Sequence, residues 1–328
     1  MYTNRTSTSS MYNLLAANVK NSEANYNRLT AQLAANSKLT SITDDPIAAV
    51  NIINTNRQIS QIGTFQQNVG LAMSELSTLD DILELTSGYL STAWNKAMQA
   101  NNGTYGVNSL KALKTEIDEI TKTMVDLGNT EFNDNYIFAG ANTKLSPYEI
   151  EENGDITYRG TPADNPNYAR RTEVADGVYE TVNVTGDKIF GYYKAATDDD
   201  PEEAEGILGV MKVLSNSIQE VIDAREAGDK TAEETALTKL NGTLDGFDKS
   251  LKNITTTQSK FGGVYNRLEM SDSTLDTTNE NLTSYLSELQ DLDYAKAISD
   301  WYQAQYAYQA SLQVTSRAMQ GLSLLNYM

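Results

Sequence analysis

The chain has 328 residues and a formal net charge of −19 at pH 7, and it contains neither cysteine nor histidine. The two missing residue types exclude disulfide bonds, thiolate and imidazole catalysis, and metal sites built from cysteine or histidine. The negative charge disfavours binding to nucleic acid and to anionic membrane surfaces.

The first ten residues are polar and rich in threonine and serine, without the apolar core of a cleavable signal peptide. No run of about 18 apolar residues occurs in the chain, which argues against a membrane-spanning helix. If the protein leaves the cell, we expect it to use a route that needs no cleaved signal peptide.

The first predicted helix covers Tyr12 to Thr40, where seam positions alternate in steps of three and four. These positions are Tyr12, Leu15, Val19, Ser22, Tyr26, Leu29, Leu33, Asn36 and Thr40, and six of the nine are apolar. An ordinary core helix would show a similar pattern. The narrow seam and its place at a chain end favour an interaction helix, in which the polar Ser22 and Asn36 set the register.

Asp44-Asp45-Pro46 marks the start of the next helix. A carboxylate caps the free N–H groups of a first turn, and proline at the first helical position loses no hydrogen bond. The alternative, two carboxylates acting as acid and base, has no accompanying catalytic groups. We therefore predict a structural cap.

Two more helices follow and form a predicted helical hairpin within a bundle. Their seam residues are Ile62, Val69, Met73, Leu76, Leu83, Leu90, Trp94 and Ala97, then Val107, Leu110, Leu113, Ile117, Ile120, Met124 and Leu127. The turn between them is Asn101-Asn102-Gly103, and Gly128-Asn129 ends the second helix.

From Glu131 to about Thr197, proline, glycine and period-two stretches predict a small antiparallel β insert of roughly sixty residues. The candidate strands are 136–138, 156–158 and 178–182, and the candidate hairpin turns are Asn153-Gly154 and Asp176-Gly177. Arg170-Arg171 inside the insert is interpreted as a solvated pair rather than an anion site.

Asp198 to Glu203 is an acidic run. Calcium binding is disfavoured because the run lacks the alternating ligands and turn glycine of a dedicated calcium loop. We expect a solvated loop that leads into a helix with apolar residues from Ile207 to Val221, ending near Gly228.

The last third, from Thr231 to Met328, contains no proline. Its apolar periodicity predicts a long helix with an apolar stripe. Unbroken, it would extend about 135 Å. The stripe is Leu237, Leu240, Leu244, Phe247, Leu251, Ile254, Phe261, Leu268, Leu275, Leu282, Leu289, Ile298, Tyr302, Leu312 and Met319. Gly262-Gly263 is expected to interrupt this stretch, and the heptad phase slips there. A second slip near 292–295 separates an inner from an outer part.

The predicted fold class is mainly α, with terminal coiled-coil and helical-bundle layers and a small β-rich central insert. The predicted parts are a terminal layer of 1–43 with 293–328, a bundle of 44–130 with 205–292, and the β-rich domain 131–204. A lone rod cannot bury its own stripe, so it must lie against other helices of the same molecule or of neighbouring copies, and the terminal layer is expected to pack against other copies.

The candidate subunit-interface residues lie on the seams of the two terminal helices. They are Tyr12, Leu15, Val19, Tyr26, Leu29, Leu33, Ile298, Tyr302, Tyr306, Leu312, Met319, Leu322 and Leu325. The tyrosines at 302, 306 and 308 are interpreted as packing surface. The chain has no glycine-rich phosphate loop and no nucleophile elbow, so no catalytic, cofactor or metal site is predicted.

Four segments resemble the flagellin superfamily of bacterial axial flagellar proteins. They are Asp44-Asp45-Pro46-Ile47-Ala48-Ala49, Asn135-Tyr136-Ile137-Phe138-Ala139-Gly140, Phe261-Gly262-Gly263-Val264-Tyr265-Asn266-Arg267-Leu268, and the tail from Tyr308 to Met328. The second segment and the tail resemble the superfamily members that form the junction between hook and filament. The resemblance covers both helical layers.

This resemblance implies a non-enzymatic building block of the bacterial flagellum, exported through the flagellar type III apparatus without cleavage and found outside the cell. Its implied partners are copies of itself in a ring, a neighbouring hook-associated protein, flagellin, and an export chaperone on the C-terminal helix. The alternatives are a flagellin-type filament subunit, a coiled-coil scaffold with no flagellar role, and an enzyme whose activity resides in the β insert.

Overall fold

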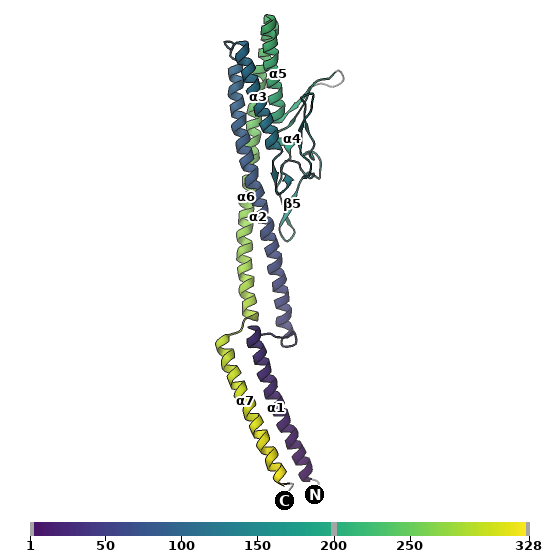
Figure 1. Cartoon of the computed structure of the whole chain (residues 1–328), viewed down its shortest axis with the longest axis vertical. Coiled ribbons are helices and arrows are strands. Elements are labelled where there is room, and N and C mark those ends of the chain that lie inside the picture. Colours follow the sequence, from purple (N-terminus) through teal and green to yellow (C-terminus); the bar gives the residue numbers. More distant parts are fainter. Residues whose placement is uncertain (1–2, 198–201, 326–328) are drawn as a thin grey trace. The chain divides into compact units, whose positions relative to one another are not determined.

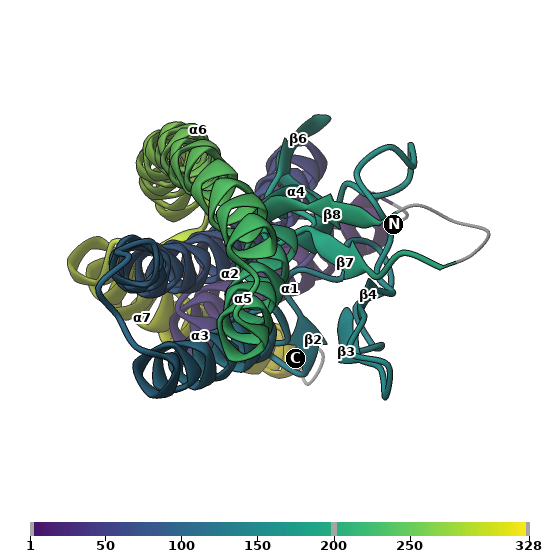
Figure 2. The same cartoon turned by 90° about the horizontal axis from the view of Figure 1, so that it is seen from above.

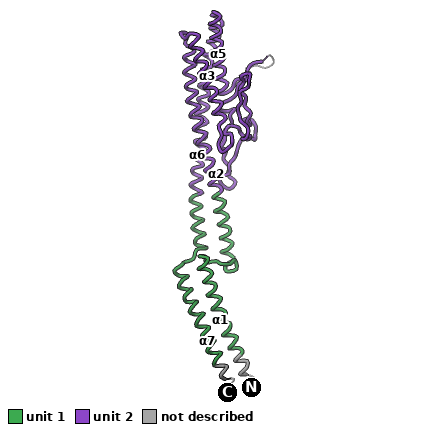
Figure 3. The backbone as a smooth tube through the Cα atoms, viewed as in Figure 1, with its two compact units in different colours: residues 1–63, 276–328 green, residues 64–275 purple. Residues whose placement is uncertain are grey.

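The computed structural model describes residues 3–197 and 202–325, with side chains from 9 to 197 and from 202 to 320. These residues form two compact units (Figure 3), Met1–Gly63 with Asp276–Met328 as unit 1, and Thr64–Leu275 as unit 2. The predicted division into three parts stays a prediction.

The described chain is mainly helical, as predicted (Figure 1). The helices are α1 (Thr3–Ala35), α2 (Pro46–Ala100), α3 (Val107–Gly128), α4 (Gly186–Ile189), α5 (Gly206–Ala227), α6 (Lys230–Gln290) and α7 (Tyr294–Leu325). The strands are β1 (Glu131–Phe132), β2 (Asn135–Tyr136), β3 (Tyr148–Ile150), β4 (Ile156–Tyr158), β5 (Arg171–Ala175), β6 (Val178–Thr181), β7 (Tyr192–Lys194) and β8 (Glu203–Glu205).

In unit 1, α1 and α7 lie side by side along their length (Figure 1). The segment after α1 begins with Asn36 at a φ of 50°, so α1 ends five residues before the predicted Thr40. Ser37 forms an antiparallel bridge with Asp291, and the Lys38 amide donates to the Gln290 carbonyl at 2.8 Å. The two breaks, after α1 and before α7, are thus hydrogen-bonded to each other.

Asp45 caps α2 as predicted. Its Oδ1 accepts hydrogen bonds from the amides of Ile47 and Ala48, each at 3.0 Å. Asp44 closes the preceding turn, because its Oδ2 accepts from the Thr40 and Ser41 amides at 3.0 and 2.9 Å. These bonds lower the pKa of the Asp44 carboxyl, since they favour its charged form.

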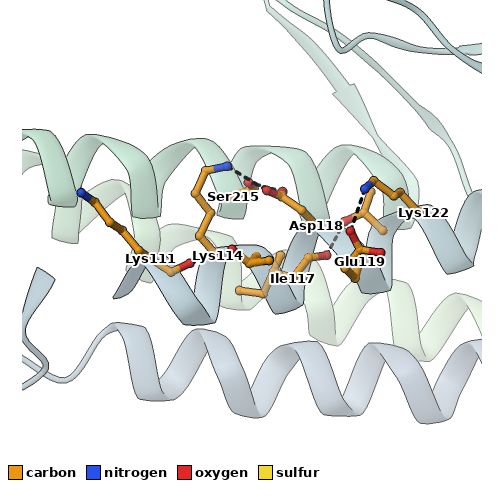
Figure 4. A network of polar contacts seen from close by, with 9 residues as sticks. Lys111, Lys114, Ile117, Asp118, Glu119, Lys122 and Ser215 are labelled. Atoms are coloured by element: carbon orange, nitrogen blue, oxygen red, sulfur yellow. Dashed lines mark hydrogen bonds and ion pairs between the residues drawn. The ribbon is translucent and has the colours of Figure 1, made fainter. Parts of the chain in front are cut away.

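In unit 2, α3 packs against α5, and the strands β7 and β8 lie on another side of α5 (Figure 2). Polar contacts flank the α3–α5 seam (Figure 4): Ser215 donates to Asp118 Oδ1 at 2.5 Å, and Lys114 pairs with Asp118 at 2.8 Å. The bundle core is apolar and includes the fully buried Leu90, Leu110, Ile117, Met124, Leu214, Ile218 and Phe247.

The β part contains an antiparallel sheet in the order β3-β4-β7-β8 and two separate hairpins, β1-β2 and β5-β6. Both predicted turns are confirmed, with Gly154 and Gly177 at φ values of 89° and 70°. The predicted strand 136–138 is wrong beyond Tyr136. Phe138 follows β2 with its ring buried, 5.1 Å from the Phe190 ring between ring centres.

Three other expectations need correction. Gly262-Gly263 does not interrupt the long helix, since α6 runs through both residues, and the break falls at Asp291–Asp293. The acidic run leads into β8 before α5, and its residues 198–201 lie outside the described ones. Arg170 is not solvated, because it is half-buried and paired with Glu75, whereas Arg171 is exposed as predicted.

Candidate assembly interface

The face of α1 that was predicted as a seam is turned toward α7. Leu29 is buried, and Leu15, Val19, Tyr26 and Leu33 are partly covered. The stripe on α1 is therefore partly covered by another helix of the same chain, and its contact with other copies stays a prediction. Tyr12, near the start of α1, remains 48% exposed.

An aromatic cluster fixes how α1 meets α7. The Tyr26 ring lies between Trp301, at 5.7 Å, and Tyr308, at 6.0 Å between ring centres. Trp301 Nε1 donates to Thr30 Oγ1 at 2.9 Å. Because this bond joins one position on each helix, it defines the register of the pair.

Small residues dominate the face of α7 that meets α1. Covered positions recur in alternating steps of four and three at Ala297, Trp301, Ala304, Tyr308, Ser311, Thr315 and Ala318, and Asp300 and Gln305 beside them are partly covered. Ala297 and Ala304 are only 6% and 5% exposed. This heptad of small residues, seven apart at Ala297, Ala304, Ser311 and Ala318, was readable in the sequence but was masked by the larger residues beside it.

The predicted interface residues of α7 whose side chains are described lie on the adjacent face of the helix. We call Ile298, Tyr302, Tyr306, Leu312 and Met319 the outer stripe. Their exposed fractions are 41%, 50%, 68%, 43% and 42%. Leu322 and Leu325 continue α7, but their side chains lie outside the described residues. On α7, the face with small residues is thus packed against α1, whereas the face with large apolar residues is exposed.

A shallow groove of about 670 Å³ runs between α1 and α7. It is lined by Ala16, Val19, Lys20, Glu23, Leu312, Thr315, Ser316, Met319 and Gln320. The groove brings Val19 of α1 next to Leu312 and Met319 of the outer stripe. The predicted interface residues of α1 and those of α7 therefore meet on one surface.

Charge is segregated along the chain. Residues 1–35 carry three basic and one acidic side chain, and residues 294–328 carry two basic and one acidic. The net charge of −19 for the whole chain therefore leaves −22 on residues 36–293. Copies that approach through α1 and α7 meet with little charge on either side, whereas the remaining surface repels.

The β part contains a hollow of about 620 Å³, lined by Tyr158, Tyr193 and Asp187 among others. Burial raises the pKa of the Tyr158 phenol, and burial with the Glu202 hydrogen bond raises that of Tyr193 to about 12. Phenols with raised pKa values are poor bases near neutral pH. Nothing in this lining resembles an activated nucleophile.

Within the described ranges, no group of three or more acidic side chains is arranged to hold a metal ion. In the same part of the chain, each helix is too short or too polar to span a lipid bilayer.

Two of the family-like segments have clear structural roles. Gly140 has a φ of 69°, and a Cβ there would lie 2.5 Å from the Thr161 carbonyl oxygen, so only glycine fits. The Tyr158 hydroxyl donates to the Phe138 carbonyl at 2.7 Å. Arg267, in the third segment, holds the β5-β6 hairpin through Glu180.

Comparison with protein families gives two matches. The family described as the bacterial flagellin N-terminal helical region matches residues 6–143. The bacterial flagellin C-terminal helical region matches residues 244–328. Together these ranges include all of α7 and α3, nearly all of α1, and the whole of α2.

Individual relatives match over nearly the whole of this chain. Flagellar hook-associated protein 3 of Escherichia coli strain K12 is 28% identical over 98% of both chains. The protein of that name from Salmonella typhimurium is 26% identical, also over 98% of both. Among solved structures, flagellar hook associated protein-3 from Legionella pneumophila has a similar fold, with a TM-score of 0.61 at 18% identity, over 73% of this chain and 98% of that one.

Proposed function

The chain belongs to the flagellin family of flagellar axial proteins, and from that premise we propose that it is the structural protein joining hook to filament. The observation that carries this proposal is the match to hook-associated protein 3 over 98% of both chains. The protein acts by assembly and not by catalysis.

Assembly proceeds through the outer stripe of α7. Full burial of one leucine or tyrosine side chain contributes roughly 1.5–3 kcal/mol, and the five residues of this stripe begin between 41% and 68% exposed. Part of this gain is offset by the conformational entropy lost when α1 and α7 are fixed in the ring. Tyr12, at the start of α1, extends the contact.

The segregation of charge supports this arrangement. The terminal helices carry a small net positive charge, whereas residues 36–293 carry −22. Copies in a ring therefore approach closely through weakly charged surfaces such as α1 and α7, and the β part faces outward, where like charges are furthest apart.

The partners follow from the proposed location. The ring of copies contacts a neighbouring hook-associated protein at one end and flagellin at the other. Before assembly, an export chaperone covers the C-terminal helix, whose outer stripe is apolar and exposed. The protein is exported by the flagellar type III apparatus without a cleaved signal peptide and resides outside the cell.

The test is cryo-electron microscopy of flagella from a strain that lacks this protein. We expect hooks to be retained and filaments to be absent, with filaments restored when the wild-type chain is supplied. Filaments of normal length on the deletion strain would refute the junction role.

A second candidate is a filament subunit, favoured by the matches to the two helical regions of bacterial flagellin. The two roles differ in copy number, since a filament contains thousands of subunits and a junction ring only a few. Quantitative mass spectrometry of sheared flagella separates them. We expect this chain to be a trace component of the filament fraction.

A further inference from the structure

The start of α2 exposes aliphatic side chains on successive turns. Ile47, Val50 and Ile53 are 76%, 54% and 59% exposed, and we call these three residues the aliphatic patch. Ile42, in the loop just before the helix, is 66% exposed. The patch belongs to unit 1, as do α1 and α7, and no described residue covers it. Contiguous apolar surface of this kind marks an interaction site.

A ring of identical subunits sets a condition on its contacts. Successive copies meet head to tail, so each contact joins two different surfaces of the same chain. One surface of unit 1 is the outer stripe on α7. The condition requires a second surface with complementary chemistry, and the aliphatic patch is an exposed apolar surface in the same unit.

The aliphatic patch and the middle of the outer stripe, from Tyr302 to Leu312, lie on helical stretches without charge. Residues 46–56 of α2 and residues 301–316 of α7 contain no Asp, Glu, Lys or Arg, although 21% of the chain is charged. Two such faces can be desolvated against each other without burying an unpaired charge. A face of α2 or α6 with carboxylates would not allow this.

The shapes and polar groups also match. The outer stripe presents the rings of Tyr302 and Tyr306, which end in hydroxyl groups. The aliphatic patch consists of β-branched side chains without rings, and Asn51 and Asn54 follow two of them along the helix. Rings that pack on aliphatic side chains need a hydrogen-bond partner for each hydroxyl at the rim, and the two asparagine amides are suitable partners.

We propose that the aliphatic patch of one copy packs against the outer stripe on α7 of the next copy. This inference rests on the proposed ring and names the two surfaces that form its repeating contact. The proposed contact also gives a reason for the exposed Ile47, because capping by Asp45 uses only the backbone amide of that residue.

The chain has no cysteine, so introduced thiols report this contact without background. The experiment places Val50→Cys and Tyr302→Cys in separate copies of the full chain, expressed together in one flagellated strain and treated with a short bis-maleimide. We expect a covalent dimer from the mixture and none from either variant alone. The double variant should give a ladder of multimers, because a head-to-tail contact propagates.

Matched controls make the result specific. Met270→Cys, 71% exposed on α6 and outside both surfaces, should give no product with either variant. A second pair, Ile47→Cys with Ile298→Cys, guards against an unfavourable geometry at one position. Dimers from Val50→Cys alone, in the yield of the mixture, would overturn the head-to-tail contact.

The inference also fails if neither pair cross-links in strains that carry normal filaments. In that case the junction role still stands, since it depends on filament loss in the deletion strain. Filaments on the deletion strain would remove the junction role whatever the cross-linking shows.

Discussion

Arg267 of α6 binds Glu180 of β6 through two parallel hydrogen bonds of 2.8 Å, Nε to Oε1 and Nη2 to Oε2. Two further contacts hold the same hairpin: Asn68 Nδ2 of α2 donates to the Glu173 carbonyl at 2.9 Å, and Arg170, just before β5, pairs with Glu75 of α2. The β5-β6 hairpin is thus fastened to two helices of unit 2. The Asn-Arg-Leu segment of α6 serves this purpose.

Arg267→Ala should release the hairpin without unfolding unit 2. The pair is partly exposed, so we expect a loss of less than about 1 kcal/mol in the free energy of unfolding. Amide hydrogen exchange should rise within residues 171–181 and little elsewhere. Lys122→Ala removes another surface ion pair and should leave exchange in the hairpin unchanged. Equal exchange in wild type and Arg267→Ala would exclude this role.

The same pair predicts a pH dependence. The hydrogen bonds from Arg267 hold the pKa of the Glu180 carboxyl below its ordinary value of 4.5. A lowered folded-state pKa means that the contribution to stability is complete above pH 4.5 and is lost as the pH falls through the folded value. Hairpin exchange, corrected for the intrinsic rate, should therefore increase below that pH in the wild type but not in Arg267→Ala.

Asp45→Ala should weaken the start of α2. It removes the oxygen that accepts from the Ile47 and Ala48 amides, which typically costs about 0.5–2 kcal/mol. Chemical denaturation monitored by circular dichroism gives the value. Asp45→Asn keeps an accepting oxygen and should lose much less. If Asp45→Asn were as destabilising as Asp45→Ala, charge rather than capping would explain the effect.

Leu312→Asp should abolish incorporation into flagella while leaving unit 2 folded, because a carboxylate in a buried contact is not cheaply desolvated. Val314→Asp is the matched control, since Val314 is 57% exposed on the same helix but lies off the outer stripe. Swimming in soft agar and immunogold labelling of hooks measure the outcome. A motile Leu312→Asp strain with normal labelling would exclude the outer stripe.

Trp301→Phe should loosen the α1–α7 pair. It removes the hydrogen bond from Trp301 Nε1 to Thr30 Oγ1, which contributes about 1 kcal/mol, and weakens the stack on Tyr26. Hydrogen exchange in the monomer should rise in α1 and α7 together. Tyr306→Phe, at a position 68% exposed, should change neither helix. Faster exchange in α7 alone would mean that the two helices do not act as a pair.

Gly140→Ala and Gly177→Ala separate backbone strain from steric conflict. Both glycines have a φ near 70°, where an L-residue costs roughly 1–2 kcal/mol. A Cβ at Gly140 would also meet the Thr161 carbonyl oxygen, whereas a Cβ at Gly177 would have no neighbouring atom within 4 Å. Thermal unfolding should therefore show a clearly larger loss for Gly140→Ala. Similar losses would mean that the Thr161 loop moves aside without cost.

Local sequence patterns predicted much of this fold. The Asp45 cap with Pro46, the turns at Gly154 and Gly177, and the end of α5 at Gly228 each depend on a few neighbouring residues whose backbone preferences are strong. The mainly α class followed from apolar periodicity over long segments. Family-like segments then indicated the flagellar relationship.

Only the tertiary structure decided which face of α7 meets α1. The helix has two adjacent apolar faces, one of small residues and one of large residues, and periodicity alone does not rank them. Packing selects Ala297 and Ala304 because small side chains let the helices approach closely around Tyr26 and Trp301. The same holds for Arg170 and Glu75, 95 residues apart, since no local pattern encodes a pairing that exists only once α2 and the hairpin are side by side.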